Sequence, residues 1–217
     1  SSEQLFKSIE NCLDYNFFVK RDQEKYGLSA LSIGDDTYQL ATDFTQFLTE
    51  EYKKFILDII QTGLERSRKY SQEPLTIGEK YSRKDAVRLL NWDKDESSTV
   101  YGYKVKHGTC PIFVTYHKDD DITETTQYQD GFLSNKVFHW YSRSNRSFKS
   151  KEVADIMQSN QTGLALYLFV KKEDGEGSDF YYLGPVSYLE DSATETRMQD
   201  GKTPVVTMNF ELANEVS

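Results

Sequence analysis

Two neighbouring runs decide the fold: Leu164-Ala-Leu-Tyr-Leu-Phe-Val-Lys171 and Phe180-Tyr-Tyr-Leu-Gly-Pro-Val-Ser-Tyr188. Both runs are rich in β-branched and aromatic residues, which favour strands. The Asp174-Gly175 pair between them is a turn signal. We therefore predict two adjacent β-strands here.

The same strand pattern recurs along most of the chain after Ser97. Further strands are predicted at residues 100–106, 111–117, 137–143 and 205–212, separated by turn signals at Gly108, Asp130-Gly131 and Asp200-Gly201. Two short helices are predicted. One runs from Ser150 to Gln158, and the other follows Ser82, whose spacing to Asp85 resembles a capping box. The pattern predicts a mixed, mostly antiparallel sheet curled into a barrel.

Residues 1–74 have a helical pattern instead. From Thr42 to Leu64 the apolar residues recur mostly at spacings of three and four, as on one face of an amphipathic helix. The pattern changes at Glu73-Pro74. We therefore expect an α+β protein with a helical region at 1–74 and a β-rich recognition domain at 75–217.

The composition excludes several classes of protein. The 217 residues contain 14% aromatic residues, which is enough for a real core despite the polar average. No apolar run of about 18 residues exists, so no membrane span is expected. The N-terminus lacks Met and a signal-peptide pattern and enters directly into helical pattern, so we expect a fragment of a longer cytoplasmic protein. Cys12 and Cys110 match no metal-binding spacing.

Positive charge is clustered although the net charge is −9. No acid occurs between Lys136 and Lys151 or between Ser97 and Lys118. The negative charge gathers in residues 119–124 and 173–179. Such clustering allows local phosphate binding by an acidic protein.

The basic, aromatic segment 136–151 is the best candidate contact surface. Alternation predicts Phe138 and Trp140 on one face of a strand, which runs into a polar loop at 142–147. Arginine binds phosphate or guanine in bidentate fashion, and an aromatic ring offers a stacking face. The expected nucleic-acid-binding residues are Arg143, Arg146, Lys149, Trp140, Ser142, Ser144 and His139, with Tyr81, Arg83 and Lys84 as a second contact and Tyr103 as another stacking ring. The alternative is that Phe138 and Trp140 are core and the arginines lie in a solvated loop.

Catalytic patterns are scarce. His107 near Cys110, with His139, leaves a thiol-dependent or metal-dependent enzyme open. His117 with Asp119, Asp120 and Asp121 could hold a cation, but consecutive acids favour a solvated turn. No phosphate-binding loop, nucleophile elbow or zinc-protease motif occurs. We expect no catalytic residues, cofactor or metal in this chain.

Six stretches in order also resemble a known bacterial domain: Tyr81-Ser-Arg-Lys-Asp85, Leu89-Leu-Asn-Trp92, Glu96-Ser-Ser-Thr-Val-Tyr-Gly-Tyr103, Thr109-Cys-Pro-Ile-Phe-Val-Thr-Tyr116, Trp140-Tyr-Ser-Arg-Ser144 and Asp179-Phe-Tyr-Tyr-Leu-Gly184. This uncharacterised domain lies at the C-terminus of large DEAD/DEAH-type helicases, which often carry a phospholipase-D-like nuclease domain. The resemblance covers most of residues 75–212.

The resemblance implies an accessory module of a bacterial helicase or restriction-type phage-defence protein, one that binds DNA or modified DNA. The strand-rich layout is also similar to the DNA-reading pseudobarrels of modification-dependent restriction enzymes. The implied partners are DNA and the helicase core of the parent chain. The alternative is a protein-interaction or regulatory domain that packs on the helicase core or on another subunit.

Overall fold

The structure is a computed structural model that describes residues 2–34, 37–68, 73–117, 130–215. The chain forms two compact units. One contains Ser1–Pro74 together with Arg88–Asp95, and the other contains Leu75–Val87 together with Glu96–Ser217. The predicted acidic run at 119–124 lies outside the described residues.

The first unit is not wholly helical. Its helices are α1 (Ser2–Leu13), α2 (Lys20–Tyr26), α3 (Thr42–Thr45) and α4 (Glu50–Ser67), but β1 (Leu31–Ile33) and β2 (Tyr38–Leu40) form a hairpin between them. The Gly34 amide donates a hydrogen bond to the Thr37 carbonyl at 2.9 Å. The expectation of helix throughout 1–74 is therefore wrong at 31–40, where a glycine turn between short apolar runs favours a hairpin.

The amphipathic segment predicted from Thr42 to Leu64 is divided into α3 and α4. The break occurs because Thr49 starts a new helix: its side-chain oxygen accepts a hydrogen bond from the Tyr52 amide at 3.2 Å. None of the residues of α4 is buried. Among the described residues, none of the helices has the length and apolar character that crossing a membrane requires.

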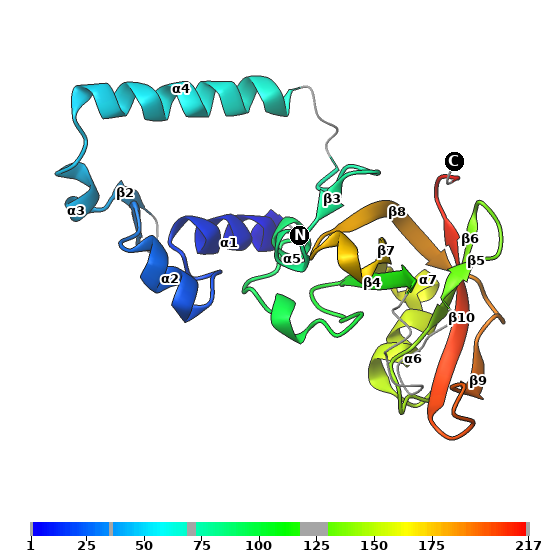
Figure 1. Cartoon of the computed structure of the whole chain (residues 1–217). Helices are drawn as coiled ribbons and strands as arrows, with labels where there is room; N and C mark the ends of the chain where they lie inside the picture. Colours follow the sequence, from blue (N-terminus) through cyan, green and yellow to red (C-terminus); the bar gives the residue numbers. More distant parts are fainter. Residues whose placement is uncertain (1, 35–36, 69–72, 118–129, 216–217) are drawn as a thin grey trace. The chain divides into compact units, whose positions relative to one another are not determined.

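The second unit is built on an eight-stranded mixed sheet (Figure 1). Its strands are β3 (Lys80–Tyr81), β4 (Thr109–His117), β5 (Gly131–Phe132), β6 (Val137–Tyr141), β7 (Ala165–Glu173), β8 (Phe180–Tyr188), β9 (Thr194–Arg197) and β10 (Pro204–Leu212). The order is β4-β7-β8-β10-β6-β5, with β3 paired to β8 and β9 paired to β10. Only the β4–β7 pair is parallel among these pairs of described strands.

The protein is α+β and its larger sheet is mixed, as predicted, but this sheet is not closed into a barrel. In the part of the chain that the structure describes, the end strands β4 and β5 do not pair with each other. The predicted strand at 100–106 is also absent from the described elements, where only single bridges join Tyr103 to Ile112 and Lys106 to Thr109. Gly102 has a φ of 83°, which turns the chain out of extended conformation at the middle of that run.

Three short helices follow in this part of the chain: α6 and α7 belong to the second unit, and α5 contains residues assigned to both units. In α5 (Arg83–Leu89), Ser82 caps as predicted, because its hydroxyl accepts the Asp85 amide at 3.1 Å and donates to the Asp85 carboxylate at 2.7 Å. The predicted helix at 150–158 appears as α6 (Lys151–Met157), followed by α7 (Ser159–Thr162). Single 3-10 turns lie at Ser97–Thr99 and Asp174–Glu176.

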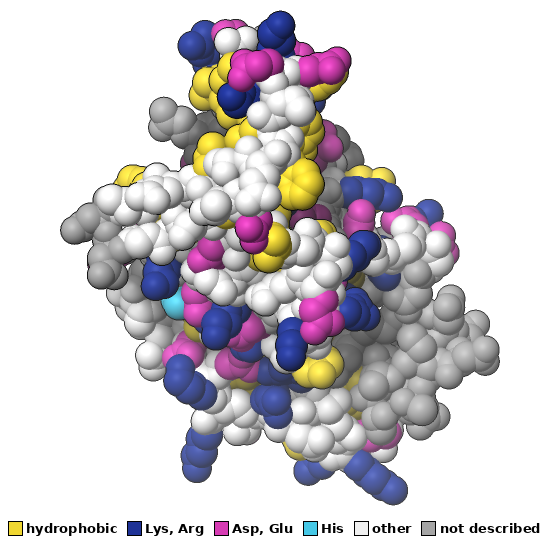
Figure 2. All heavy atoms as spheres, turned by 90° about the vertical axis from the view of Figure 1, so that its left-hand side faces the viewer, with side chains coloured by type: hydrophobic (Ala, Val, Ile, Leu, Met, Phe, Trp, Pro, Cys, Tyr) yellow, Lys and Arg dark blue, Asp and Glu magenta, His cyan; other side chains and the backbone are white. Residues whose placement is uncertain are grey.

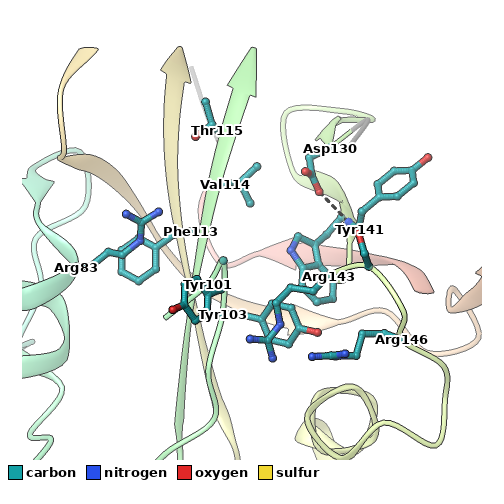
Figure 3. Close-up of a pocket in the computed structure, with 13 residues that line it drawn as sticks. Arg83, Tyr101, Tyr103, Phe113, Val114, Thr115, Asp130, Tyr141, Arg143 and Arg146 are labelled. Atoms are coloured by element: carbon teal, nitrogen blue, oxygen red, sulfur yellow. Dashed lines mark hydrogen bonds between the residues drawn. The ribbon is translucent and has the colours of Figure 1, made fainter. Parts of the chain in front are cut away.

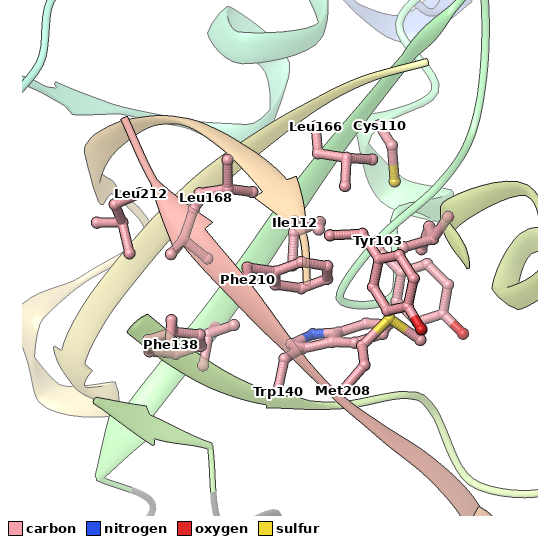
Figure 4. Packing of buried hydrophobic residues seen from close by; sticks show 14 of the residues in the cluster. Tyr103, Cys110, Ile112, Phe138, Trp140, Leu166, Leu168, Met208, Phe210 and Leu212 are labelled. Carbon is pink, nitrogen blue, oxygen red and sulfur yellow. The ribbon is translucent and has the colours of Figure 1, made fainter. Parts of the chain in front are cut away.

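One apolar cluster fills the space between the sheet and α6 (Figure 4). Alternate residues of β6 and β10 contribute to it, including Phe138, Trp140, Met208 and Phe210, and α6 adds Val153 and Ile156. Along β6, the period-two pattern of the sequence therefore specifies which side chains enter this cluster.

We expect Leu168→Ala to destabilise the second unit by about 2–5 kcal/mol, because the truncation leaves a cavity in a close-packed core. Leu168 is 0% exposed, whereas Leu133 is 63% exposed, so Leu133→Ala is the matched control. Urea unfolding of both variants measures the difference. Equal midpoints for the two variants would contradict this placement of the core.

Candidate nucleic-acid interface

A cavity of about 530 Å³ opens beside the end of β6 (Figure 3). It is assembled from α5, the turn before β4, β4 itself, the residue before β5, and β6 with its following loop. The lining residues are Arg83, Tyr101, Gly102, Tyr103, Phe113, Val114, Thr115, Asp130, Trp140, Tyr141, Arg143, Ser144 and Arg146. The cavity thus combines guanidinium groups with aromatic rings, and all of these residues belong to the second unit.

Arg143 is held in place from two sides. Its guanidinium lies 4.5 Å from the centre of the Tyr103 ring, and one of its terminal nitrogens donates to the Glu152 carboxylate of α6. Its Nε is buried and has no hydrogen-bond partner among the described residues. A cation stacked on a ring and paired with a carboxylate is pre-positioned, although Glu152 neutralises part of its charge.

Tyr103 and Trp140 form the buried wall of the cavity. They are 1% and 2% exposed, and their rings meet nearly perpendicularly, with centroids 4.9 Å apart. Burial raises the pKa of Tyr103, and the nearby Arg143 charge opposes this rise. The structure therefore places both rings in the core with little free face, rather than on the open stacking surface that the sequence suggested. Strand alternation explains this, because Trp140 points to the same side as Phe138.

The lining of the cavity also includes a carboxylate. The carboxylate Oδ1 of Asp130 accepts a hydrogen bond from the Tyr141 amide at 2.7 Å. The pKa of Tyr141 is raised, first by burial and then by the Asp130 charge. Asp130 is the one carboxylate among the described lining residues, against three arginines. A negatively charged hydrogen-bond acceptor thus lines the same cavity as the arginines and the aromatic rings.

Arg83 is the member of the predicted second contact that reaches the cavity. Its guanidinium lies 4.7 Å and 5.4 Å from the ring centres of Phe180 and Phe113. Lys84 is not a lining residue. The Tyr81 hydroxyl instead accepts the Thr76 amide at 2.9 Å, which gives it a structural role.

Of the contact residues predicted in the loop after β6, some line the cavity and others do not. Ser142 is 0% exposed: its amide donates to the Val206 carbonyl at 2.8 Å, and its hydroxyl accepts the Val206 amide at 2.9 Å. Ser142 therefore extends the β6–β10 pairing and is not a surface contact. Ser144 and Arg146 line the cavity, whereas Lys149 is exposed outside it.

His139 lies on the other face of β6 from Trp140. Its Nδ1 is 2.7 Å from Oδ1 of Asn209, and its ring packs edge-on against Tyr141 at 5.3 Å. It supports Tyr141 from outside and does not line the cavity. The cavity residues that the sequence did not single out include Tyr101, Asp130 and Thr115, which lie on segments interpreted only as strand or turn.

The acid-free stretch after Ser97 is less basic than its sequence suggests. Glu96, the residue immediately before it, accepts hydrogen bonds from both Lys104 and Lys106. These lysines lower the pKa of Glu96, with Lys104 the larger cause. The positive charge of these two lysines is therefore partly neutralised within the protein.

The side chains of the enzymatic alternative occupy different surroundings. Cys110 is 0% exposed, and burial raises the pKa of its thiol far above its ordinary value. His107 lies in an exposed turn with a φ of 49°, and His139 is paired with Asn209. Among the described residues, no group of three His, Cys, Asp or Glu side chains is placed to hold a metal ion. The aspartates suggested near His117 lie outside the described residues.

Comparison with protein families gives two matches. The family described as Domain of unknown function (DUF3427) matches residues 75–217, and the family described as Domain of unknown function (DUF8090) matches residues 1–72. No curated protein matches the chain.

Three solved structures illustrate the similarity to known folds. The DNA modification-dependent restriction endonuclease AspBHI is 12% identical over 66% of this chain, with a TM-score of 0.46. KRYPTONITE in complex with mCHG DNA and SAH is 8% identical over 66%, with a TM-score of 0.42. The sulfur binding domain and SRA domain of ScoMcrA, complexed with phosphorothioated DNA, is 10% identical over 64%, with a TM-score of 0.36. The chain covers 43%, 33% and 40% of these structures.

We expect Glu96→Gln to weaken the second unit at neutral pH by up to about 1 kcal/mol, since partly exposed ion pairs contribute little. The pKa of Glu96 is lowered by folding. Its contribution is therefore present above the ordinary carboxyl pKa of about 4.3 and is lost as the pH falls through the lower folded value.

Urea unfolding at pH 7 and at pH 3 measures this difference. The control is Glu190→Gln, because Glu190 is exposed and has no ion pair among the described residues. A wild-type to Glu96→Gln difference that stayed constant down to pH 3 would contradict the prediction.

Proposed function

The chain belongs to the DUF3427 family of domains, and we propose that its second unit binds DNA by taking one unstacked nucleotide into the cavity beside β6. The observation that carries the proposal is the combination of three arginines, a carboxylate and aromatic rings around one cavity. The volume of about 530 Å³ suits a single small ligand.

Each part of the cavity fits a feature of a nucleotide. Arg143 and Arg146 supply guanidinium groups for phosphate oxygens (Figure 3). Tyr101, which is 68% exposed, offers a ring face for stacking. The Asp130 carboxylate can accept a hydrogen bond from an exocyclic amino group, as acids do from cytosine. Enzymes and readers that extrude a base bind it through such edge contacts and stacking.

The same reasoning supports a preference for particular bases, modified bases included. The cavity walls are rigid, because Tyr103 and Trp140 are packed in the core. A rigid wall discriminates between bases by the groups they add or lack. We further propose that the domain is an accessory module of a larger helicase or restriction-type protein, as the resemblance of its six sequence stretches implies.

We expect Arg146→Ala to weaken DNA binding about tenfold, the loss typical of one charge-assisted hydrogen bond. It should also lower the slope of log affinity against log salt by about 0.7–0.9. Fluorescence anisotropy with labelled oligonucleotides, from about 50 mM salt upward, measures both quantities. Arg146 is preferred to Arg143 because the latter also supports Tyr103 and Glu152.

The matched control is Lys172→Ala, which removes an exposed cation of β7 outside the cavity. It should leave both affinity and slope unchanged. Absence of binding by the wild type at about 50 mM salt, or an unaltered Arg146→Ala variant, would overturn the proposed function.

A second candidate function, contact with another protein, is favoured by α4. Tyr52, Phe55 and Ile59 lie on one side of this helix, at spacings of three and four residues, and are 47%, 61% and 71% exposed. Figure 2 shows hydrophobic side chains at the surface among charged ones in the region of this helix. Exposed apolar patches of this kind mark interaction sites. We propose that this face binds a protein partner, the helicase core of the parent chain being the first to test.

We expect Ile59→Asp to abolish co-purification with the separated helicase core, because a charge cannot be buried unpaired in an apolar interface. The neighbouring Asp58→Asn on the same helix should leave co-purification intact, since Asp58 is exposed and remains polar. The contact would be refuted if the two variants recovered equal amounts of the helicase core. It would also be refuted if the wild type recovered none.

A further inference from the structure

A second cavity, of about 260 Å³, lies next to the candidate site, and Arg146 lines both. Its other walls come from Ser147 and from the β9–β10 hairpin, at Glu195, Thr196, Arg197, Pro204 and Val205. The same arginine therefore contributes to two cavities of the second unit.

The charges of this second cavity suit an anion. Arg146 and Arg197 face a single described carboxylate, that of Glu195. One oxygen of Glu195 accepts the Phe148 amide at 2.7 Å, so this acid is engaged in anchoring the loop. One terminal nitrogen of Arg197 donates to the Lys202 carbonyl at 2.6 Å, which fixes the side chain and leaves further N–H groups of its fork for a ligand.

Hydrogen bonds within the protein hold both walls in place. In the turn of the hairpin, Asp200 accepts the amides of Lys202 and Thr203 at 2.8 and 2.9 Å. In the facing loop, the amides of Asn145 and Arg146 donate to the Pro204 carbonyl at 2.8 and 3.4 Å. A site fixed in this way loses little conformational entropy on binding.

We propose that the second cavity holds the phosphate next to the nucleotide bound in the first cavity, with Arg197 and Arg146 as its donors. This inference rests on the proposed function. Successive phosphates are joined by one sugar, so a strand anchored in the first cavity carries its next phosphate to an adjacent one. Phosphate contacts fix the register of a strand and carry no base information. The first cavity thus selects the base, and the second sets the path of the backbone.

Two variants test these two roles, and the measurements are the affinity, its salt dependence and the preference between bases. With the 217-residue chain and labelled oligonucleotides, Arg197→Ala should weaken binding about tenfold. It should also lower the salt slope by about 0.7–0.9. The ratio of affinities for two oligonucleotides that differ in one base should stay at the wild-type value. Asp130→Asn, whose amide oxygen can still accept the Tyr141 amide, should change that ratio and leave the slope unaltered.

The remaining outcomes distinguish the two proposals. If Arg197→Ala behaves like the Lys172→Ala control while Arg146→Ala loses affinity, the backbone path is wrong and DNA binding by the first cavity stands. If Arg197→Ala changes the base preference as Asp130→Asn does, the second cavity does not act as a phosphate site. If the wild type binds no oligonucleotide at about 50 mM salt, the proposed function itself fails.

Discussion

The paired hydrogen bonds between Ser142 and Val206 connect the core to the candidate site. They continue the β6–β10 pairing one residue beyond the end of β6. On the strand side of this point, Trp140 is fixed in the core against Phe210, with ring centroids 5.4 Å apart. On the loop side, Arg143 is directed across the Tyr103 ring toward Glu152. The packing of the sheet thus determines where the first cationic group of the cavity lies.

Much of the sheet was predictable from the sequence, because its long strands are rich in β-branched and aromatic residues and are separated by turn signals. The runs at Phe180–Tyr188 and Pro204–Leu212 appear as strands with boundaries close to those expected. Several features of the sheet were not predicted, and two of them show why. The run at 100–106 has strand-like composition but turns at Gly102, whose φ is positive. The strand β9 is exposed throughout, so no alternation of apolar residues marks it.

The sequence predicted the central segment of the site, but it did not predict all of the residues that line the cavity. Arg143, Arg146 and Ser144 line the cavity, and all three came from the basic loop that the sequence singled out. Asp130 and Tyr101 come from other segments of the chain, and it is the order of the strands in the sheet that brings these segments to the cavity. Local sequence also hid the pairing of charges: Glu96 and Glu152 lie outside the acid-free stretches whose cations they bind. Clusters of positive charge in a sequence are therefore an incomplete guide to the field of the folded protein.

Trp140 and Tyr103 are both core residues and cavity wall, so the packing of the unit constrains the inner wall of the cavity. A substitution at either ring would remove a large buried side chain and destabilise the unit. The rim is under no such constraint, since Tyr101 is 68% exposed and Thr115 and Ser144 are only partly buried. Substitutions that change the chemistry of the cavity without loss of stability are therefore expected at these rim positions, while the inner wall stays the same.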